Sequence, residues 1–212
     1  MIAKTIAYVK QELKDAEAGH DWFHIERVYN LAMMIAKTES CDIKVVQYGA
    51  LLHDIADSKF HDGDETIGSK KASNFLKSIN ESDEVINHVI KIIENISFKG
   101  GNFQQDFKSK ELDIVQDADR LDAMGAIGIA RTFNYGGFKN MPLYDPEIKP
   151  NLNMDKNTYK KSKAPTINHF HEKLLLLKDR MNTNKGSEIA QIRHNFMVDY
   201  LQQFKNEWHV KV

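Results

Sequence analysis

The chain has little of what characterises secreted or membrane proteins. It contains one cysteine, Cys41, so no disulfide can form within the chain. No apolar run approaches the length needed to span a bilayer, and charged residues interrupt the first twenty positions, where a signal peptide would be apolar. We therefore expect a soluble, cytoplasmic protein of a reducing compartment, with no membrane partner.

Glycine and proline are also scarce, at 11 and 4 of 212 residues, whereas 42% of the residues are hydrophobic. This composition predicts a globular, helix-tolerant chain, and its length suits a single domain over residues 1–212. The net charge of −1 provides no basic field for a nucleic-acid backbone. We expect no polymeric nucleic acid as partner, whereas a small phosphorylated ligand needs only two or three cations at one pocket.

Apolar residues recur at intervals of three and four along most of the chain, and neither strand alternation nor an internal repeat stands out. This pattern predicts an all-α fold. The stretch at 136–163 is rich in Asn, Pro, Asp and Lys and is expected to be a long surface loop, of the kind that often serves as a lid. Helices are expected at about 2–18, 22–37, 42–56, 64–79, 83–96, 110–134, 166–181 and 187–208.

Imidazoles and carboxylates occupy positions where these helices should bury hydrocarbon. His53 and Asp54 lie on the apolar third helix, Asp119 lies among apolar residues of the sixth, and His24 lies at the edge of the apolar stripe of the second. A lone carboxylate in a core costs several kcal/mol unless it is paired, protonated or bound to a cation. A shared metal ion explains all four residues together.

Each of these residues also has a simpler interpretation. His24 alone fits a histidine at the boundary of a core, and an aspartate in an apolar helix is often ion-paired. Arg120 in particular could pair with Asp117 and leave no site at all. The joint occurrence on three separate apolar helices favours the metal.

Two imidazoles and two carboxylates form a mixed N/O ligand set without thiolate. Such a set suits one six-coordinate divalent ion, manganese first, with Mg, Zn, Fe, Co or Ni as the alternatives. A bound ion of this kind promotes hydrolysis of phosphate esters or anhydrides. Asp57, one turn beyond His53 and Asp54, overhangs the same point and is the candidate general acid and base.

Cations for a phosphorylated substrate are expected near these residues. Arg27 and Lys59 are nearest by spacing, Lys99 beside two glycines is a looser choice, and His88 can hydrogen-bond a phosphate. The alternative for each cation is a solvated charge, and for His88 it is packing on an apolar helix. The chain has no P-loop, no dinucleotide-binding glycine motif and no motif for a nucleophilic Ser or Cys.

The order His24, His53-Asp54, Asp119 resembles the H…HD…D signature of the HD-domain metal-dependent phosphohydrolases. The resemblance implies that these four residues are the metal ligands and that Asp57 is the acidic helper after the doublet. It also implies an HD-domain helical bundle with a metal-binding core at about 20–125 and additional C-terminal helices at about 166–208. One bacterial branch of the family is resembled more fully, through the segments 19–24, 27–28, 50–54, 117–122, 131–137 and 142–146.

For function, the resemblance implies a small nucleotide as substrate and leaves two reactions open. A nucleoside triphosphate would be cleaved to monophosphate and pyrophosphate, or a monophosphate to nucleoside and phosphate. One alternative is a non-catalytic HD domain that senses a nucleotide or binds a partner protein. Another is an iron oxygenase on the related scaffold, but that needs a second metal and further histidines, and only His61 and His88 lie between the doublet and Asp119. We expect one metal and a monomer or homodimer.

Overall fold

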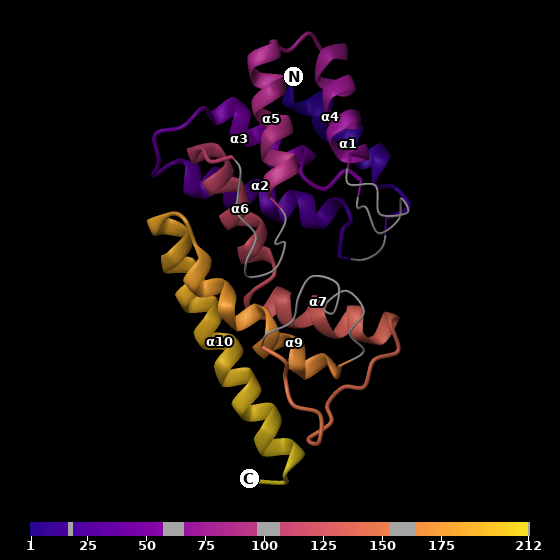
Figure 1. Cartoon of the computed structure of the whole chain (residues 1–212), viewed down its shortest axis with the longest axis vertical. Helices are drawn as coiled ribbons and strands as arrows, with labels where there is room; N and C mark the ends of the chain where they lie inside the picture. The colour runs from indigo at the N-terminus through magenta and orange to yellow at the C-terminus, as the bar shows by residue number, and fades with distance from the viewer. Residues whose placement is uncertain (17–18, 57–65, 97–106, 153–163, 212) are drawn as a thin grey trace. The chain divides into compact units, whose positions relative to one another are not determined.

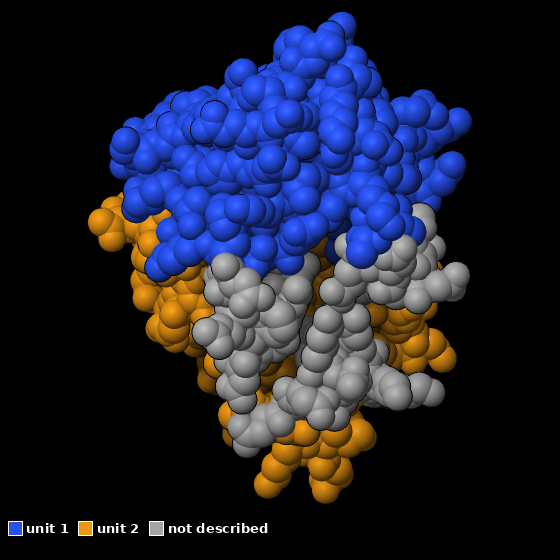
Figure 2. All heavy atoms as spheres, turned by 45° about the horizontal axis from the view of Figure 1, so that its top comes forward, with its two compact units in different colours: residues 1–119 blue, residues 120–212 orange. Residues whose placement is uncertain are grey.

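The computed structural model describes residues 1–16, 19–56, 66–96, 107–152 and 164–211. Every regular element in these ranges is a helix, which confirms the all-α fold (Figure 1). The chain groups into two compact units, residues 1–119 and 120–212 (Figure 2). None of the described helices has both the length and the apolar character to cross a membrane.

Unit 1 is built around α3. The sequence of this helix is apolar on nearly all sides, which predicted a central position. α3 packs against α1, α2 and α5, and its residues Val46, Ala50 and Leu51 are fully buried. Gly49 brings α3 close to α5 and α6, because a Cβ there would lie 3.3 Å from side-chain atoms of Ile92 and Val115. The helices of this unit are α1 (Ile2–Glu12), α2 (Trp22–Ala36), α3 (Ile43–Leu52), α4 (Ile67–Ser78), α5 (Asp83–Asn95) and the greater part of α6 (Lys110–Asp122).

Side-chain caps fix where four of these helices begin, and Ser109, which accepts the backbone N–H of Leu112, is the cap of α6. Asp21 accepts a hydrogen bond from the backbone N–H of His24 at the start of α2. Asp42 caps α3 in the same way, and the predicted cap Ser82 accepts the backbone N–H of Val85 at the start of α5. Caps of this kind each stabilise a helix by about 1 kcal/mol. The cap Asp21 fixes the turn of α2 from which His24 projects.

Unit 2 consists of the helices that follow α6. α10 packs against α7 and against the 3₁₀ helix η2, and α9 packs against α7 and η2. Its core includes the fully buried Phe170 and Met197. The elements are α7 (Gly125–Phe138), α9 (Thr166–Glu172), η2 (Leu174–Arg180) and α10 (Asn184–Trp208).

The prediction of one long helix at 110–134 was wrong. α6 ends at Asp122 and α7 begins at Gly125, with Met124 extended at φ −116° and ψ 164° between them. Gly125 has φ +71°, which favours glycine, and a Cβ on Gly128 would lie 2.2 Å from the carbonyl oxygen of Ala123. These glycines form the corner between two helices, and Gly125 also lies against α10, because an added Cβ would be 3.0 Å from Cγ of Arg193.

Other helix boundaries also differ from the predicted ones. α1 ends at Glu12 rather than at 18, and α3 ends at Leu52, so that His53 is its C-terminal cap. α7 continues to Phe138, into the stretch expected to be loop. The helix expected at 166–181 is divided into α9 and η2 at Lys173, whose φ and ψ of −140° and −58° are not helical.

Candidate metal centre

Three of the predicted ligands converge in unit 1. His24 projects from the first turn of α2, His53 from the end of α3, and Asp119 from α6. The His24 and His53 Nε2 atoms lie 3.3 Å apart, and they lie 3.6 and 3.8 Å from Oδ1 of Asp119. Both imidazoles are buried, whereas Asp119 is partly exposed. The ligand atoms of all three residues lie within 4.8 Å of one another, as around a single ion.

The tautomer of His53 is fixed by the helix that carries it. Its Nδ1 lies 2.9 Å from the carbonyl oxygen of Ala50, which can only accept, so Nδ1 carries the hydrogen and donates. The Nε2 lone pair is thereby directed toward His24 and Asp119. Two imidazole nitrogens and a carboxylate oxygen this close repel one another unless a proton or a cation lies between them. The donor set therefore fits a divalent cation.

Asp54 lies at the edge of this cluster. Its Oδ2 is 4.0 Å from His24 Nε2, and it accepts a hydrogen bond from His20 Nδ1 at 2.5 Å. Burial raises the pKa of Asp54. The hydrogen bond from His20 and the charges of His20, His53 and His24 together outweigh burial and lower this pKa from 3.8 to about 2. Asp54 is thus an anion at neutral pH. Its role as fourth ligand stays a prediction.

His20 contacts this site although the sequence pattern had predicted no role for it. It precedes the cap of α2, and its ring lies edge-on to that of His24, with centroids 6.0 Å apart. The available signal was the spacing of four residues between His20 and His24, which brings two imidazoles to one side of a helix start. His20 holds Asp54 rather than joining the three-residue cluster.

Neighbouring residues of α6 are engaged elsewhere. The Asp122 carboxylate accepts a hydrogen bond from Arg131 Nη1 at 2.7 Å, within unit 2. Arg120 donates a hydrogen bond to the carbonyl oxygen of Arg180. Asp117 is fully buried. Of the aspartates on this helix, Asp119 is the one that belongs to the metal cluster.

The predicted catalytic residue and the predicted substrate-binding residues are only partly covered by the structure. Asp57, Lys59 and Lys99 lie outside the described residues. Arg27 is a half-buried residue of α2. His88 Nε2 lies 2.9 Å from Ser109 Oγ and 3.4 Å from Glu111 Oε2, at the start of α6. These contacts favour its packing role, and contact of His88 with a substrate stays a prediction.

Comparison with known proteins places this geometry in a family. The model of the HD domain matches residues 22–124. The uncharacterized protein YpgQ of Bacillus subtilis is 37% identical over 94% of this chain and 90% of its own length. Its crystal structure in complex with ADP has a TM-score of 0.77, with 97% of this chain and 94% of that chain covered.

Two further crystal structures resemble the whole chain. An HD-superfamily hydrolase from Bacillus thuringiensis is 42% identical, with a TM-score of 0.78 and 98% and 96% of the two chains covered. A protein from Lactobacillus plantarum is 33% identical, with a TM-score of 0.85 and 99% and 97% covered. The chain belongs to the HD-domain superfamily of metal-dependent phosphohydrolases, as the spacing of His24, His53-Asp54 and Asp119 predicted. It is therefore a metal-dependent hydrolase.

Proposed function

We propose that the protein hydrolyses a phosphoanhydride or phosphoester bond of a small nucleotide, with one divalent ion held by His24, His53, Asp54 and Asp119. The observation that carries this proposal is the convergence of His24, His53 and Asp119 in a chain of the HD family. The nucleotide is supported by the relative YpgQ, whose crystal structure holds ADP. We expect the reaction in the cytoplasm, because one cysteine suits a reducing compartment.

The bound ion, with manganese as first choice, would act as a Lewis acid that lowers the pKa of water and neutralises charge on a phosphoryl oxygen. The chain itself orients the ligands. Ala50 fixes the tautomer of His53, and His20 holds the Asp54 carboxylate in one place and keeps it ionised. Fixed, ionised ligands reduce the reorganisation needed on binding, which is the usual effect of residues that hydrogen-bond metal ligands.

The remaining roles follow from position along the chain. Asp57, directly after the doublet, is proposed as the general acid and base that moves the proton between water and leaving group. The phosphates are proposed to contact Arg27, Lys59, Lys99 and His88. Either a triphosphate would be cleaved to monophosphate and pyrophosphate, or a monophosphate would be cleaved to nucleoside and phosphate.

The test is turnover of a nucleotide panel. Purified protein is incubated with Mn²⁺ and nucleoside mono-, di- and triphosphates, and the products are identified by chromatography. Asp54→Ala should abolish turnover, whereas Asp199→Ala, which removes an exposed aspartate of α10, should leave it unchanged. Release of pyrophosphate or of phosphate names the bond cleaved. An Asp54→Ala protein that is active but retains no metal would contradict the proposed metal-dependent mechanism.

A further inference from the structure

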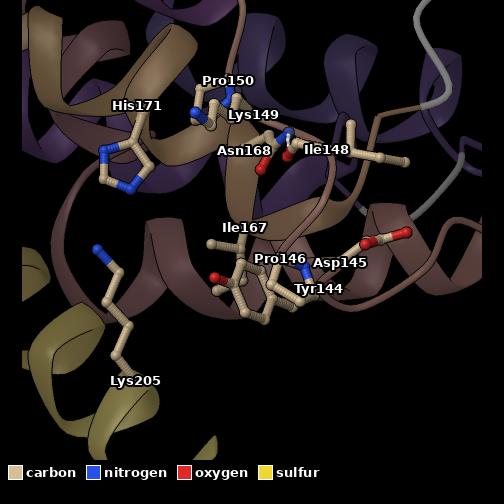
Figure 3. Close-up of a pocket in the computed structure, with 10 residues that line it drawn as sticks. All are labelled: Tyr144, Asp145, Pro146, Ile148, Lys149, Pro150, Ile167, Asn168, His171 and Lys205. Atoms are coloured by element: carbon tan, nitrogen blue, oxygen red, sulfur yellow. Dashed lines mark hydrogen bonds between the residues drawn. The ribbon is translucent and has the colours of Figure 1, made fainter.

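Unit 2 contains a pocket of about 130 Å³ that the proposed function does not use (Figure 3). It is lined by the segment 144–150, by α9 and by Lys205 of α10. Three of the lining residues, Lys149, His171 and Lys205, carry basic nitrogens. All the lining residues belong to unit 2, whereas the candidate metal ligands belong to unit 1.

Two basic groups in this pocket, those of Lys205 and His171, face each other. In Figure 3 the amino group of Lys205 points toward the ring of His171, and burial followed by the charge of Lys205 lowers the pKa of His171. No ion pair of Lys149, His171 or Lys205 occurs within the described residues. Asp145 is the acidic lining residue, but its carboxylate accepts the backbone N–H of Glu147 and lies on the side opposite His171.

The wall of the pocket is held in place by bonds to the rest of unit 2. Asn168 Nδ2 donates to the carbonyl oxygen of Ile148 at 2.9 Å, and the backbone N–H of Asn151 donates to Glu172 at 2.9 Å. The ring of Tyr144 meets Phe204 and Trp208 edge-on, with centroids 5.8 and 5.0 Å apart. The backbone that carries Lys149 is therefore held in place before a ligand arrives, which favours binding.

We propose that this pocket binds the phosphate group of a small molecule. A phosphate dianion matches two ammonium groups in charge, which a single carboxylate does not, and its oxygens can accept from Lys149, from Lys205 and from the ring N–H of a neutral His171. Inorganic phosphate and the phosphate of a nucleotide present the same chemistry. The proposal rests on unit 2 alone and stands apart from the hydrolytic activity.

The test is a phosphate titration of the full-length protein, followed by NMR of the histidine side chains. EDTA is present and ionic strength is held constant with NaCl, so that neither bound metal nor screening changes. Inorganic phosphate should shift the His171 signals saturably. AMP should do so at least as strongly, and adenosine, which lacks the phosphate, should not. Equal affinity for AMP and phosphate assigns the site to phosphate alone, and tighter AMP binding assigns it to a nucleotide.

Variants separate this pocket from general attraction to lysines. Lys205→Gln and Lys149→Gln should each weaken phosphate binding about tenfold, the usual effect of losing a hydrogen bond to a charged group. Lys149 is exposed, so its replacement does not disturb packing. Lys185→Gln, which removes a lysine paired with Glu188, is the matched control and should have no effect. Absence of a saturable His171 shift, or unchanged affinity in both pocket variants, would overturn the proposal.

Discussion

At the scale of single residues, the hydrogen bond from His20 to Asp54 supports a carboxylate beside the candidate metal centre. It adds an imidazole that is not among the clustered ligands, and it fixes one oxygen of a carboxylate that is predicted to be the fourth ligand. Asp54 would otherwise carry the cost of partial burial without compensation. We therefore expect His20 to act as a positioning residue for the predicted ligand Asp54.

Replacing His20 tests this role. His20→Ala should weaken Mn²⁺ binding by roughly 10- to 100-fold, the range found for residues that hydrogen-bond metal ligands. His20→Asn should restore part of the affinity, because the amide nitrogen of Asn can occupy the place of Nδ1. Both affinities are measured by isothermal titration calorimetry, with the exposed His209→Ala as control. Unchanged Mn²⁺ affinity in His20→Ala would show that Asp54 needs no such support.

His169 provides a second residue-scale prediction, for acid stability. Burial and then the charge of Lys173 lower its pKa from 6.5 to about 3, so the folded state binds its proton more weakly than the unfolded state. The contribution of neutral His169 is complete above pH 6.5 and is lost as the pH falls toward 3. Over this window His169 should lower the free energy of unfolding by up to about 1.4 kcal/mol per pH unit.

Urea unfolding at pH 7.5, 5.5 and 4.5 measures this loss. His169→Gln should flatten the pH dependence, while His209→Gln should not. His171 and His194 also have lowered pKa values, and their contributions remain in both variants. An identical pH dependence in His169→Gln and the unaltered protein would contradict the role assigned to burial.

Of the contacts in the candidate site, the sequence predicted the cluster of metal-ligand residues but not the hydrogen bond between His20 and Asp54. His24, His53 and Asp119 were predicted to meet because metal-ligand residue types on apolar helices are visible in the chain itself. The bond between His20 and Asp54 joins residues 34 positions apart, and nothing local to either one indicates the other. Tertiary packing alone brings them together.

At the scale of elements, the corner between α6 and α7 determines where α6, the helix that carries Asp119, comes to an end. Local propensity predicted a continuous helix, because the apolar period runs on through the glycines. The decisive features are the positive φ of Gly125 and the space that Gly128 leaves for the carbonyl of Ala123. Backbone contacts of this kind are not encoded in the apolar period, whereas the cap at Ser82 was predictable because its signal is local.

Gly128→Ala tests the corner directly. The added Cβ would lie 2.2 Å from a backbone oxygen, so α7 must shift, and we expect a loss of about 1–3 kcal/mol in the free energy of unfolding. Gly137→Ala is the matched control on the same helix, since no atom lies within 4 Å of its Cβ position. There the change should be neutral or stabilising by up to about 1 kcal/mol. Equal effects of the two variants in urea unfolding would disprove the steric explanation.

At the scale of the whole molecule, the structure has two compact units, whereas the sequence predicted one HD-type domain over residues 1–212. We propose that the two units unfold together. α6 runs from Lys110 to Asp122 and contributes residues to both, so loss of either unit removes partners of the same helix. The HD-domain model ends at residue 124, whereas the solved relatives match nearly the entire chain.

Differential scanning calorimetry tests this proposal of a single domain. One transition is expected, with a calorimetric enthalpy equal to the van't Hoff enthalpy. Circular dichroism at 222 nm should give the same midpoint. Two separate transitions, or a van't Hoff enthalpy well below the calorimetric value, would assign the units to independent domains.

The central claim is that one divalent ion is held by His24, His53, Asp54 and Asp119. Equilibrium dialysis against Mn²⁺, with the bound metal determined by mass spectrometry, tests it most directly. We expect one ion per chain in the unaltered protein and in Asp199→Ala, with binding lost in His24→Ala and Asp54→Ala. Two ions per chain, or full binding in both ligand variants, would contradict it.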